Sequence, residues 1–161
     1  MNEWINFNKG NEIGDQARSE LMSWWHGLSP KDSADLRRCR TSAEVVETRP
    51  YYNLVTSLKK LGRVQTNKLP GAVLLLAQVK KYTPEQVLPR QLGQVGLKDI
   101  QFRLLLRTSS PEQRVAMIRR WLPRVKYATN ILFLTQAMIS WGPGSRRKWA
   151  EQFYQVENTN Q

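Results

Sequence analysis

Apolar residues recur three and four positions apart along most of the chain, the spacing of one face of an α-helix. The first such stripe consists of Ile13, Ala17, Leu21, Trp24 and Leu28. Similar spacing predicts further helices over residues 30–39, 49–61, 70–81, 98–107, 110–122 and 127–141, and a last helix from residue 145. Alternating strand patterns and Asn-Gly-type hairpin turns are missing from the sequence. We therefore predict an all-α helical bundle with no strand pairing.

Residues that favour helix ends stand where the stripes begin and stop. Ser29-Pro30 offers a cap followed by a proline at the first helical position. Capping boxes are expected at Thr41–Glu44 and at Ser110–Gln113. Pro123 is expected to end or kink the helix that precedes it. These signals place the breaks between helices independently of the apolar pattern.

The last helix is expected to begin after a break at Gly142-Pro143-Gly144. Ser145 can cap it. Trp149, Phe153 and Val156 then follow at helical spacing and are predicted to face inward.

Residues 82–97 lack a regular apolar pattern and contain Pro84, Pro89, Gly93 and Gly96. We interpret them as a linker loop between an N-terminal helical lobe, residues 1–81, and a C-terminal helical lobe, residues 98–161. A loop of this length inside a compact protein is uncommon and is often functional.

Charge is distributed very unevenly along the 161 residues, whose formal net charge is +12. Residues 1–48 carry 6 basic and 8 acidic side chains, whereas residues 49–161 carry 19 basic and 5 acidic ones. Between Gln113 and Ala150 there are eight Lys or Arg residues and no carboxylate. Such unpaired like charges weaken a compact fold, and a basic face of this kind usually binds an anionic polymer. The charge pattern favours nucleic acid over a membrane surface or an acidic protein.

The compartment follows from what the sequence lacks. The first residues have neither the basic stretch nor the apolar run of a signal peptide, and no apolar stretch approaches the roughly 20 residues that span a bilayer. Cys39 is the only cysteine, so an internal disulfide is ruled out. We expect a cytoplasmic protein without membrane contact.

The side chains that enzymes use are scarce. His26 is the only histidine, and without a partner it is expected to be packed or exposed rather than catalytic. Cys39 stands in an arginine run that could lower its pKa, but no second histidine or defined acid completes a site. Asp99 and Glu112 are isolated, whereas metal-dependent nucleases cluster their carboxylates. We predict no enzymatic activity, no metal site and no cofactor.

Two basic runs near helix ends carry different expectations. Arg37 and Arg38 fall in the last turn of their helix, where cations interact favourably with the helix dipole. A structural role and a binding role therefore explain them equally well. Arg146, Arg147 and Lys148 fall in the first turn expected for the last helix, where acidic residues would be more stable. A phosphate meeting these cations and the free helix amides explains that run better.

Further candidates come from the remaining helices. Arg119 and Arg120 flank the apolar arc of the helix from Ser110, although long cationic stems can simply extend outward from a core-facing helix. The tryptophans stand at core spacing and are expected to pack rather than to stack on bases. The full set of predicted nucleic-acid-binding residues is Arg37, Arg38, Arg90, Arg103, Arg107, Arg119, Arg120, Arg146, Arg147 and Lys148.

An ordered series of motifs resembles the CasB family, the small subunit of the type I-E CRISPR Cascade complex. The motifs are Trp24-Trp25, Ala34–Arg38, Arg49–Val55, Lys98–Leu105, Ile118–Leu122, Ser140–Gly142 and Arg146–Ala150. The resemblance spans roughly residues 17–156. One departure is Gln101, where the family often has arginine, and Gly142-Pro143-Gly144 is a local variation.

The resemblance implies a non-catalytic part of an antiviral ribonucleoprotein. The chain would be present in more than one copy, between the backbone subunits and the large subunit. Its basic faces would contact the backbones of guide RNA and target DNA and hold the displaced strand of the R-loop. Cleavage would belong to a separate helicase-nuclease.

Two other classes remain open. A helix-turn-helix regulator could use the helices on either side of residue 40, although the second is short and carries Glu44 and Glu47, whereas a recognition helix should be longer and basic. A basic adaptor that binds only proteins is also compatible with the composition.

Overall fold

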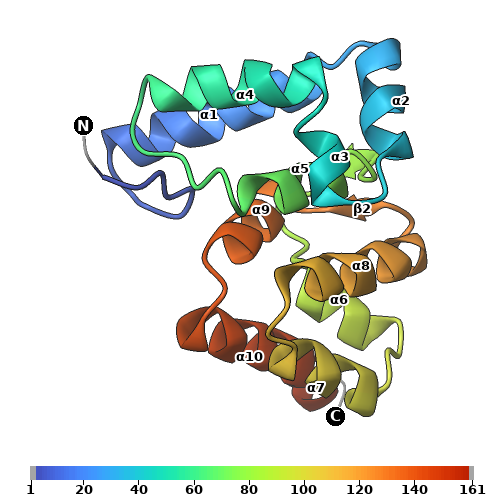
Figure 1. Ribbon diagram of the computed structural model, residues 1–161. Helices are drawn as coiled ribbons and strands as arrows, with labels where there is room; N and C mark the ends of the chain where they lie inside the picture. The colour runs from blue at the N-terminus through green and yellow to red at the C-terminus, as the bar shows by residue number, and fades with distance from the viewer. Residues whose placement is uncertain (1–2, 160–161) are drawn as a thin grey trace.

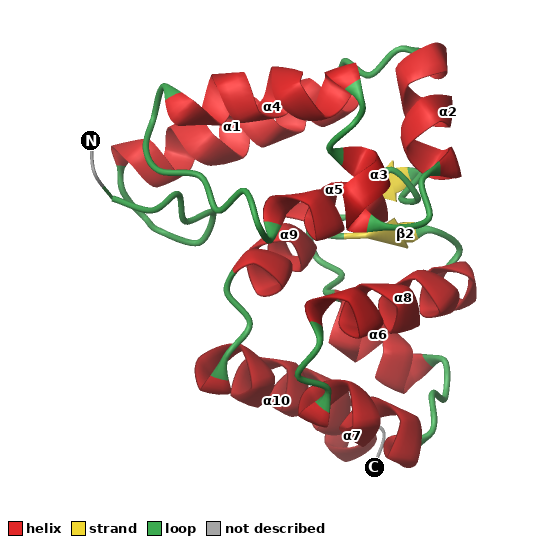
Figure 2. Ribbon diagram, viewed as in Figure 1, coloured by secondary structure: helices red, strands yellow, loops and turns green. Residues whose placement is uncertain are grey.

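The structure is a computed structural model that describes residues 3–159, with side chains described up to residue 155. This part of the chain is almost entirely helical, which confirms the all-α prediction (Figures 1 and 2). Its elements, in order, are α1 (Glu12–His26), α2 (Pro30–Arg38), α3 (Ser42–Val45), α4 (Arg49–Lys59), α5 (Leu69–Leu76), β1 (Lys81–Tyr82), α6 (Leu88–Gln94), α7 (Asp99–Arg107), α8 (Pro111–Trp121), the 3-10 helix η1 (Leu122–Val125), β2 (Ala128–Thr129), α9 (Ile131–Ile139) and α10 (Pro143–Thr159).

Helix α5 lies at the centre of the fold. All eight of its residues are buried, because α3, α8 and α9 pack against it. Gly71 permits the close approach of α8, since a Cβ at that position would lie 3.0 Å from Val115 Cγ2. On one side of α5, α1 and α4 lie side by side, and on the other side α6 packs against α10 (Figure 1). The buried apolar residues form one continuous cluster from Ile5 to Phe153.

The helix caps predicted at Ser29, Thr41 and Ser110 are present. Ser29 Oγ accepts a hydrogen bond from the backbone N–H of Asp32 at 3.0 Å, and Ser110 Oγ accepts one from Gln113 at 3.2 Å. Thr41 Oγ1 accepts from Glu44 at 3.3 Å. The Glu44 carboxylate takes the N–H of Arg40 at 3.1 Å, one residue earlier than a capping box requires.

The prediction of no strand pairing is wrong. Two residues of β1 pair in parallel with two of β2, Lys81 with Ala128 and Tyr82 with Thr129 (Figure 2). The helix predicted over 70–81 therefore ends at Leu76. An isolated bridge also joins Trp4 to Arg63. These pairings join segments far apart in the sequence, which no local apolar pattern can reveal.

The helix predicted over 127–141 begins later, at Ile131. Lys126 and Tyr127 both adopt left-handed backbone conformations, with φ of 57° and 58°, and this reversal directs the chain from η1 into β2. Asn130 Oδ1 then accepts the N–H of Phe133 at 3.0 Å and caps α9. Pro123 does end the regular part of α8, because η1 follows at once.

Residues 82–97 are not the irregular loop that their prolines and glycines suggested. They contain α6, in which Leu88 and Leu92 are fully buried. Pro89 stands in the first turn of this helix, where its missing N–H costs nothing. The division into two lobes joined at 82–97 stays a prediction.

The helices of the described residues are short where they are most apolar. Helices α5 and α9 have eight and nine residues, and no helix in this part of the chain combines the length and apolar character needed to cross a membrane.

Candidate nucleic-acid interface

The ten predicted binding residues are nearly all on the surface. Nine of them are exposed and only Arg119 is half-buried. They lie on five helices: α2, α6, α7, α8 and α10. Their exposure is what a phosphate-binding surface requires, but their hydrogen bonds divide them into groups with different functions in the fold.

Arg119 holds the end of α2 against α8. Its Nη1 donates to the carbonyl oxygen of Cys39 at 2.7 Å, and its Nη2 donates to that of Arg37 at 3.0 Å. The last carbonyls of a helix have no partner within the helix, so an arginine fork from another helix satisfies them. Arg119 is therefore a structural residue first, whatever it contributes to binding.

Arg37 and Arg38 occupy the last turn of α2, as predicted. Arg37 Nη1 donates to Ser33 Oγ at 2.9 Å, and Arg38 Nη2 lies 2.6 Å from Asp35 Oδ1. The second contact is an exposed ion pair, and such pairs contribute only about 0–1 kcal/mol. Neither guanidinium is therefore withheld from an anionic partner.

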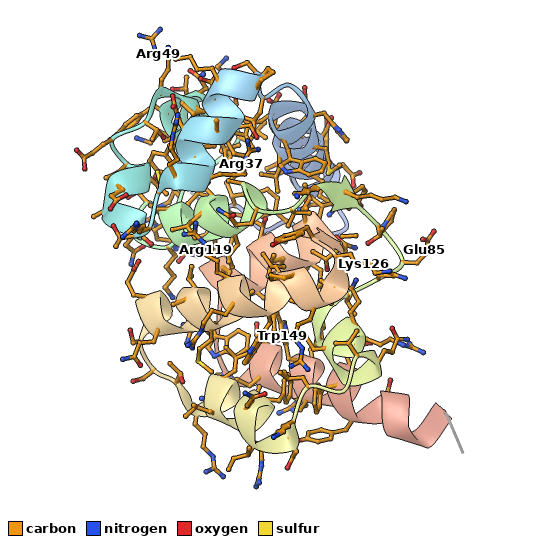
Figure 3. All side chains as sticks on the ribbon, turned by 90° about the vertical axis from the view of Figure 1, so that its right-hand side faces the viewer. Arg37, Arg49, Glu85, Arg119, Lys126 and Trp149 are labelled. Atoms are coloured by element: carbon orange, nitrogen blue, oxygen red, sulfur yellow. The ribbon has the colours of Figure 1, made fainter. Side chains whose placement is uncertain are left out.

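Arg120 contributes to a hollow on the surface of α8. Arg40, Arg119 and Arg120 line it together with Glu112, and its volume is about 390 Å³. Figure 3 shows Arg37 and Arg119 on the same side of the molecule, near the place where α2, α5 and α8 meet. The structure thus brings the α2 and α8 candidates into one basic region.

The α7 candidates lie elsewhere. Arg103 and Arg107 are exposed on α7, and Arg103 Nε lies 3.0 Å from Asp99 Oδ2. Asp99 also accepts a hydrogen bond from the Tyr154 hydroxyl, which fixes it between α7 and α10. Gln101 is exposed on the same helix, and Arg90 is exposed on α6.

The α10 cluster consists of Arg146, Arg147 and Lys148. It does not lie in the first helical turn, contrary to the prediction. Helix α10 begins at Pro143, and the N–H of Arg146 already donates to Gly142 O at 2.9 Å. Ser145 is not the cap, because its Oγ donates to Ser140 O at 2.8 Å. The cluster therefore begins beyond the free amides, where the dipole effect fades. The premise that the cluster occupies the first turn of the helix is wrong.

Trp149 and Phe153 confirm the predicted inner face of α10. Trp149 is 1% exposed and Phe153 is 4% exposed, with the Phe153 ring stacked on Phe102 at 3.9 Å between centroids. The labelled Trp149 lies inside the lower half of Figure 3. The side chain of Val156, the third predicted member, lies outside the described residues.

Arg114 raises the positive potential beside the α10 cluster. It is 5% exposed, donates through Nη1 to Thr108 O at 2.7 Å, and lies 5.0 Å above the Trp141 ring. Burial lowers the pKa of Arg114, and the nearby positive charge of Arg146 lowers it further. A buried cation beside an exposed one favours an anion at this end of α10.

The candidates therefore do not form one patch. Figure 1 shows the end of α8 and the start of α10 on opposite sides of the lower half of the molecule. The region around α2 and α8 and the α10 cluster can each contact a nucleic-acid backbone, but at separate places.

The residues considered for catalysis do not come together in one site. Burial raises the pKa of Cys39, and Glu44 adds to this effect more than Arg119 offsets it, so the arginine run does not activate the thiol. The thiol donates to Asp35 O at 3.4 Å. His26 is exposed, with its ring edge-on to Trp25. Among the described residues, no three His, Cys, Asp or Glu side chains gather as metal ligands would.

Three exposed cations outside the predicted binding set lie close to the region around α2 and α8: Arg40, Lys80 and Lys81. Arg40 was visible as the end of the basic run at 37–40. The pair Lys80-Lys81 directly precedes Tyr82, and a dibasic pair beside an aromatic residue is a signal of nucleic-acid binding that could have been used.

Comparisons with known proteins give a match in structure only. No protein-family model matches the chain, and no curated protein matches its sequence. A chain in a crystal structure of E. coli Cascade bound to a PAM-containing dsDNA target has a similar fold, with a TM-score of 0.70 and 17% sequence identity. The match covers 89% of this chain and 97% of that chain. At this identity the similarity concerns the fold.

Proposed function

We propose that this protein is a non-catalytic subunit of a CRISPR RNA-guided DNA surveillance ribonucleoprotein. Its basic helical surfaces bind the backbones of guide RNA, target DNA and the displaced strand. The observation that carries this proposal is the fold, which agrees over nearly the whole of both chains with a component of a DNA-bound Cascade complex.

The surface chemistry supports the same proposal. Exposed arginines and lysines outnumber nearby carboxylates around both α8 and α10, and they stand on rigid helices. In RNA-guided recognition the guide reads the sequence by base pairing, while protein contacts to the backbone can shift the near-balanced exchange of strands. A subunit with this function needs cations more than base-reading side chains.

The finer assignment is to the small subunit of a type I-E complex, in the cytoplasm. Its support is the ordered set of CasB-like motifs, several of which lie on α2, α4, α7, α8 and α10. The partners would be the backbone subunits, the large subunit and a second copy of the chain. Nuclease activity would belong to another protein.

The regulator alternative lacks a suitable recognition helix. Helix α3 consists of Ser42–Val45, a single turn, and the exposed Glu44 is one of its four residues. A helix that reads the major groove presents several side chains to base edges and is basic. We therefore set the regulator aside.

Binding of the full chain to single-stranded DNA, measured against salt concentration, tests the general proposal. Log affinity should fall with log salt at about −0.7 per neutralised phosphate, with little dependence on base sequence. Arg107→Gln and Arg120→Gln should weaken binding, whereas Lys60→Gln at the end of α4 serves as a matched surface control. A flat salt response, or strong preference for one duplex sequence, would contradict it.

Co-purification from cells tests the finer assignment. We expect the tagged chain to bring down a defined short RNA with several other proteins. Recovery of the chain without RNA would count against the surveillance complex. Metal-dependent cleavage of nucleic acid by purified protein, lost on replacing one carboxylate, would overturn the non-catalytic assignment.

A further inference from the structure

A groove between the end of α1, α2 and β1 combines aromatic rings with cations. Its volume is about 600 Å³, within the usual range for ligand-binding sites. The residues that line it are Trp25, His26, Leu28, Ser33, Arg37, Leu76, Ala77, Val79, Lys80, Lys81 and Tyr82. Among them are three aromatic or heteroaromatic rings and three cations, and no carboxylate.

The rings are held in position by the fold. Trp25 Nε1 donates to Leu76 O at 3.0 Å, and the exposed His26 ring lies 5.0 Å from the Trp25 ring between centroids. Tyr82 comes from the other side, from β1, whose backbone is fixed by pairing with Thr129. Both His26 and Tyr82 retain accessible surface toward the groove.

The cations are likewise supported without being neutralised. Arg37 is bonded to the neutral Ser33 hydroxyl, and Lys80 Nζ lies 4.6 Å from the Tyr127 ring centroid. The acids of α2 do not line the groove: Asp35 pairs with Arg38, and Asp32 faces a different hollow beside α4 that also contains Glu20. Among the described residues, the groove is thus lined by cations without a carboxylate, and the hollow beside α4 by carboxylates without a cation.

We propose that this groove binds a nucleotide of a single strand, with its base stacked on His26 and Tyr82 and its flanking phosphates held by Arg37, Lys80 and Lys81. Aromatic side chains beside a cationic track are the arrangement by which proteins bind single strands without reading sequence, and each stacked base adds about tenfold or more in affinity. The inference rests on the proposed function and adds a base-dependent site to a surface otherwise expected to contact phosphates.

The test compares two strands of equal length and charge, a short oligodeoxyadenylate and the same sugar-phosphate chain with abasic sites. We expect the parent protein to bind the base-containing strand about tenfold more tightly. His26→Ala combined with Tyr82→Leu should bring this ratio close to one and leave abasic binding unchanged. Tyr52→Leu, which removes an exposed tyrosine of α4, should leave the ratio as in the parent.

Three further arms sharpen the result. Lys81→Gln and Arg37→Gln should weaken binding of both strands alike, because they act on phosphate. An oligoriboadenylate shows whether RNA or DNA is the preferred source of the base. His26→Ala alone changes an exposed side chain and should give a ratio of the two affinities between those of the parent and the double variant. It replaces the double variant if circular dichroism shows that the double variant is unfolded.

The outcomes separate this inference from the proposed function. A parent that binds both strands equally, with ratios unmoved by the variants, overturns the stacking site and leaves the backbone-binding subunit intact. A parent that binds neither strand overturns the proposed function. Polyglutamate that competes as well as the abasic strand, with no base-dependent term, would assign the groove to an acidic protein.

Discussion

Replacing Arg119 should lower the free energy of unfolding, even though the residue belongs to a basic surface region. Its two guanidinium hydrogen bonds, to the carbonyls of Cys39 and Arg37, join α8 to the end of α2. Arg119→Ala removes both and leaves two helix-end carbonyls without this partner.

The expected cost follows from the surroundings of those carbonyls. A hydrogen bond with a charged partner contributes about 1.5–3 kcal/mol. Arg37 is exposed, so water can replace the arginine at its carbonyl, whereas Cys39 is only 5% exposed. Counting the bond to Cys39 alone gives about 1.5–3 kcal/mol. For a protein of this size, each kcal/mol lowers the melting temperature by about 2–4 °C, so a decrease of roughly 3–12 °C is expected.

Thermal unfolding followed by circular dichroism, with urea unfolding as a second measure, provides the assay. Arg120→Ala is the matched control. Arg120 is the exposed neighbour of Arg119 on α8, so its replacement should change stability by less than about 0.5 kcal/mol. Arg119→Lys should fall between the two, because an ammonium cannot reproduce the fork. If Arg119→Ala melts within about a degree of Arg120→Ala, the assignment of Arg119 to the fold is wrong.

Three other changes test separate features. Replacing the α10 cluster with glutamine should leave stability within about 0.5 kcal/mol and lower the salt slope of single-strand binding by up to about 2, and an unchanged slope would remove the cluster from the interface. Tyr51→Phe should raise stability by about 1 kcal/mol, because the buried hydroxyl has no hydrogen-bond partner among the described residues. Burial, with a smaller effect of Tyr52, raises the pKa of Tyr51 to about 12. The fold therefore tolerates the neutral phenol better than the phenolate, and stability is lost as pH rises from 10 through 12. The free energy of unfolding in urea, measured between pH 10 and 12, should therefore fall less steeply with pH for Tyr51→Phe than for the parent. Gly96→Ala should cost about 1 kcal/mol through its φ of +80° alone, whereas Gly144→Ala, in equally open space within α10, should be neutral or stabilising.

Local chemistry explains what the sequence could predict of the fold. The caps at Ser29 and Ser110 each depend on a serine hydroxyl and the backbone N–H three residues later, and both form as expected. The start of α10 was mistaken because Ser145 was preferred to Pro143, although proline at the first helical position is an equally local signal. Its effect reaches the site, since it moved the α10 cluster by about a turn.

Long-range pairing explains what could not be predicted. The partners of β1 lie in β2, and each strand has only two residues, too few to show an alternating pattern. Helix α6 depends on Leu88 and Leu92 finding a buried surface next to α10. The excess of basic residues was evident from composition. The use of Arg119 as a helix-end partner, and the placement of His26 and Tyr82 in one groove, depend on the three-dimensional fold.

The complete burial of α5 has a mechanical consequence. An eight-residue helix without a charged side chain is unstable alone in water, so it depends on α8 and α9, which come from later in the sequence. If synthesis stopped after residue 81, the chain would accordingly expose the apolar surface of α5 and would be prone to aggregate. If the proposed contacts at α8 and at α10 both form, a displacement of α8 by one partner would act directly on α5, because the two helices are packed against each other.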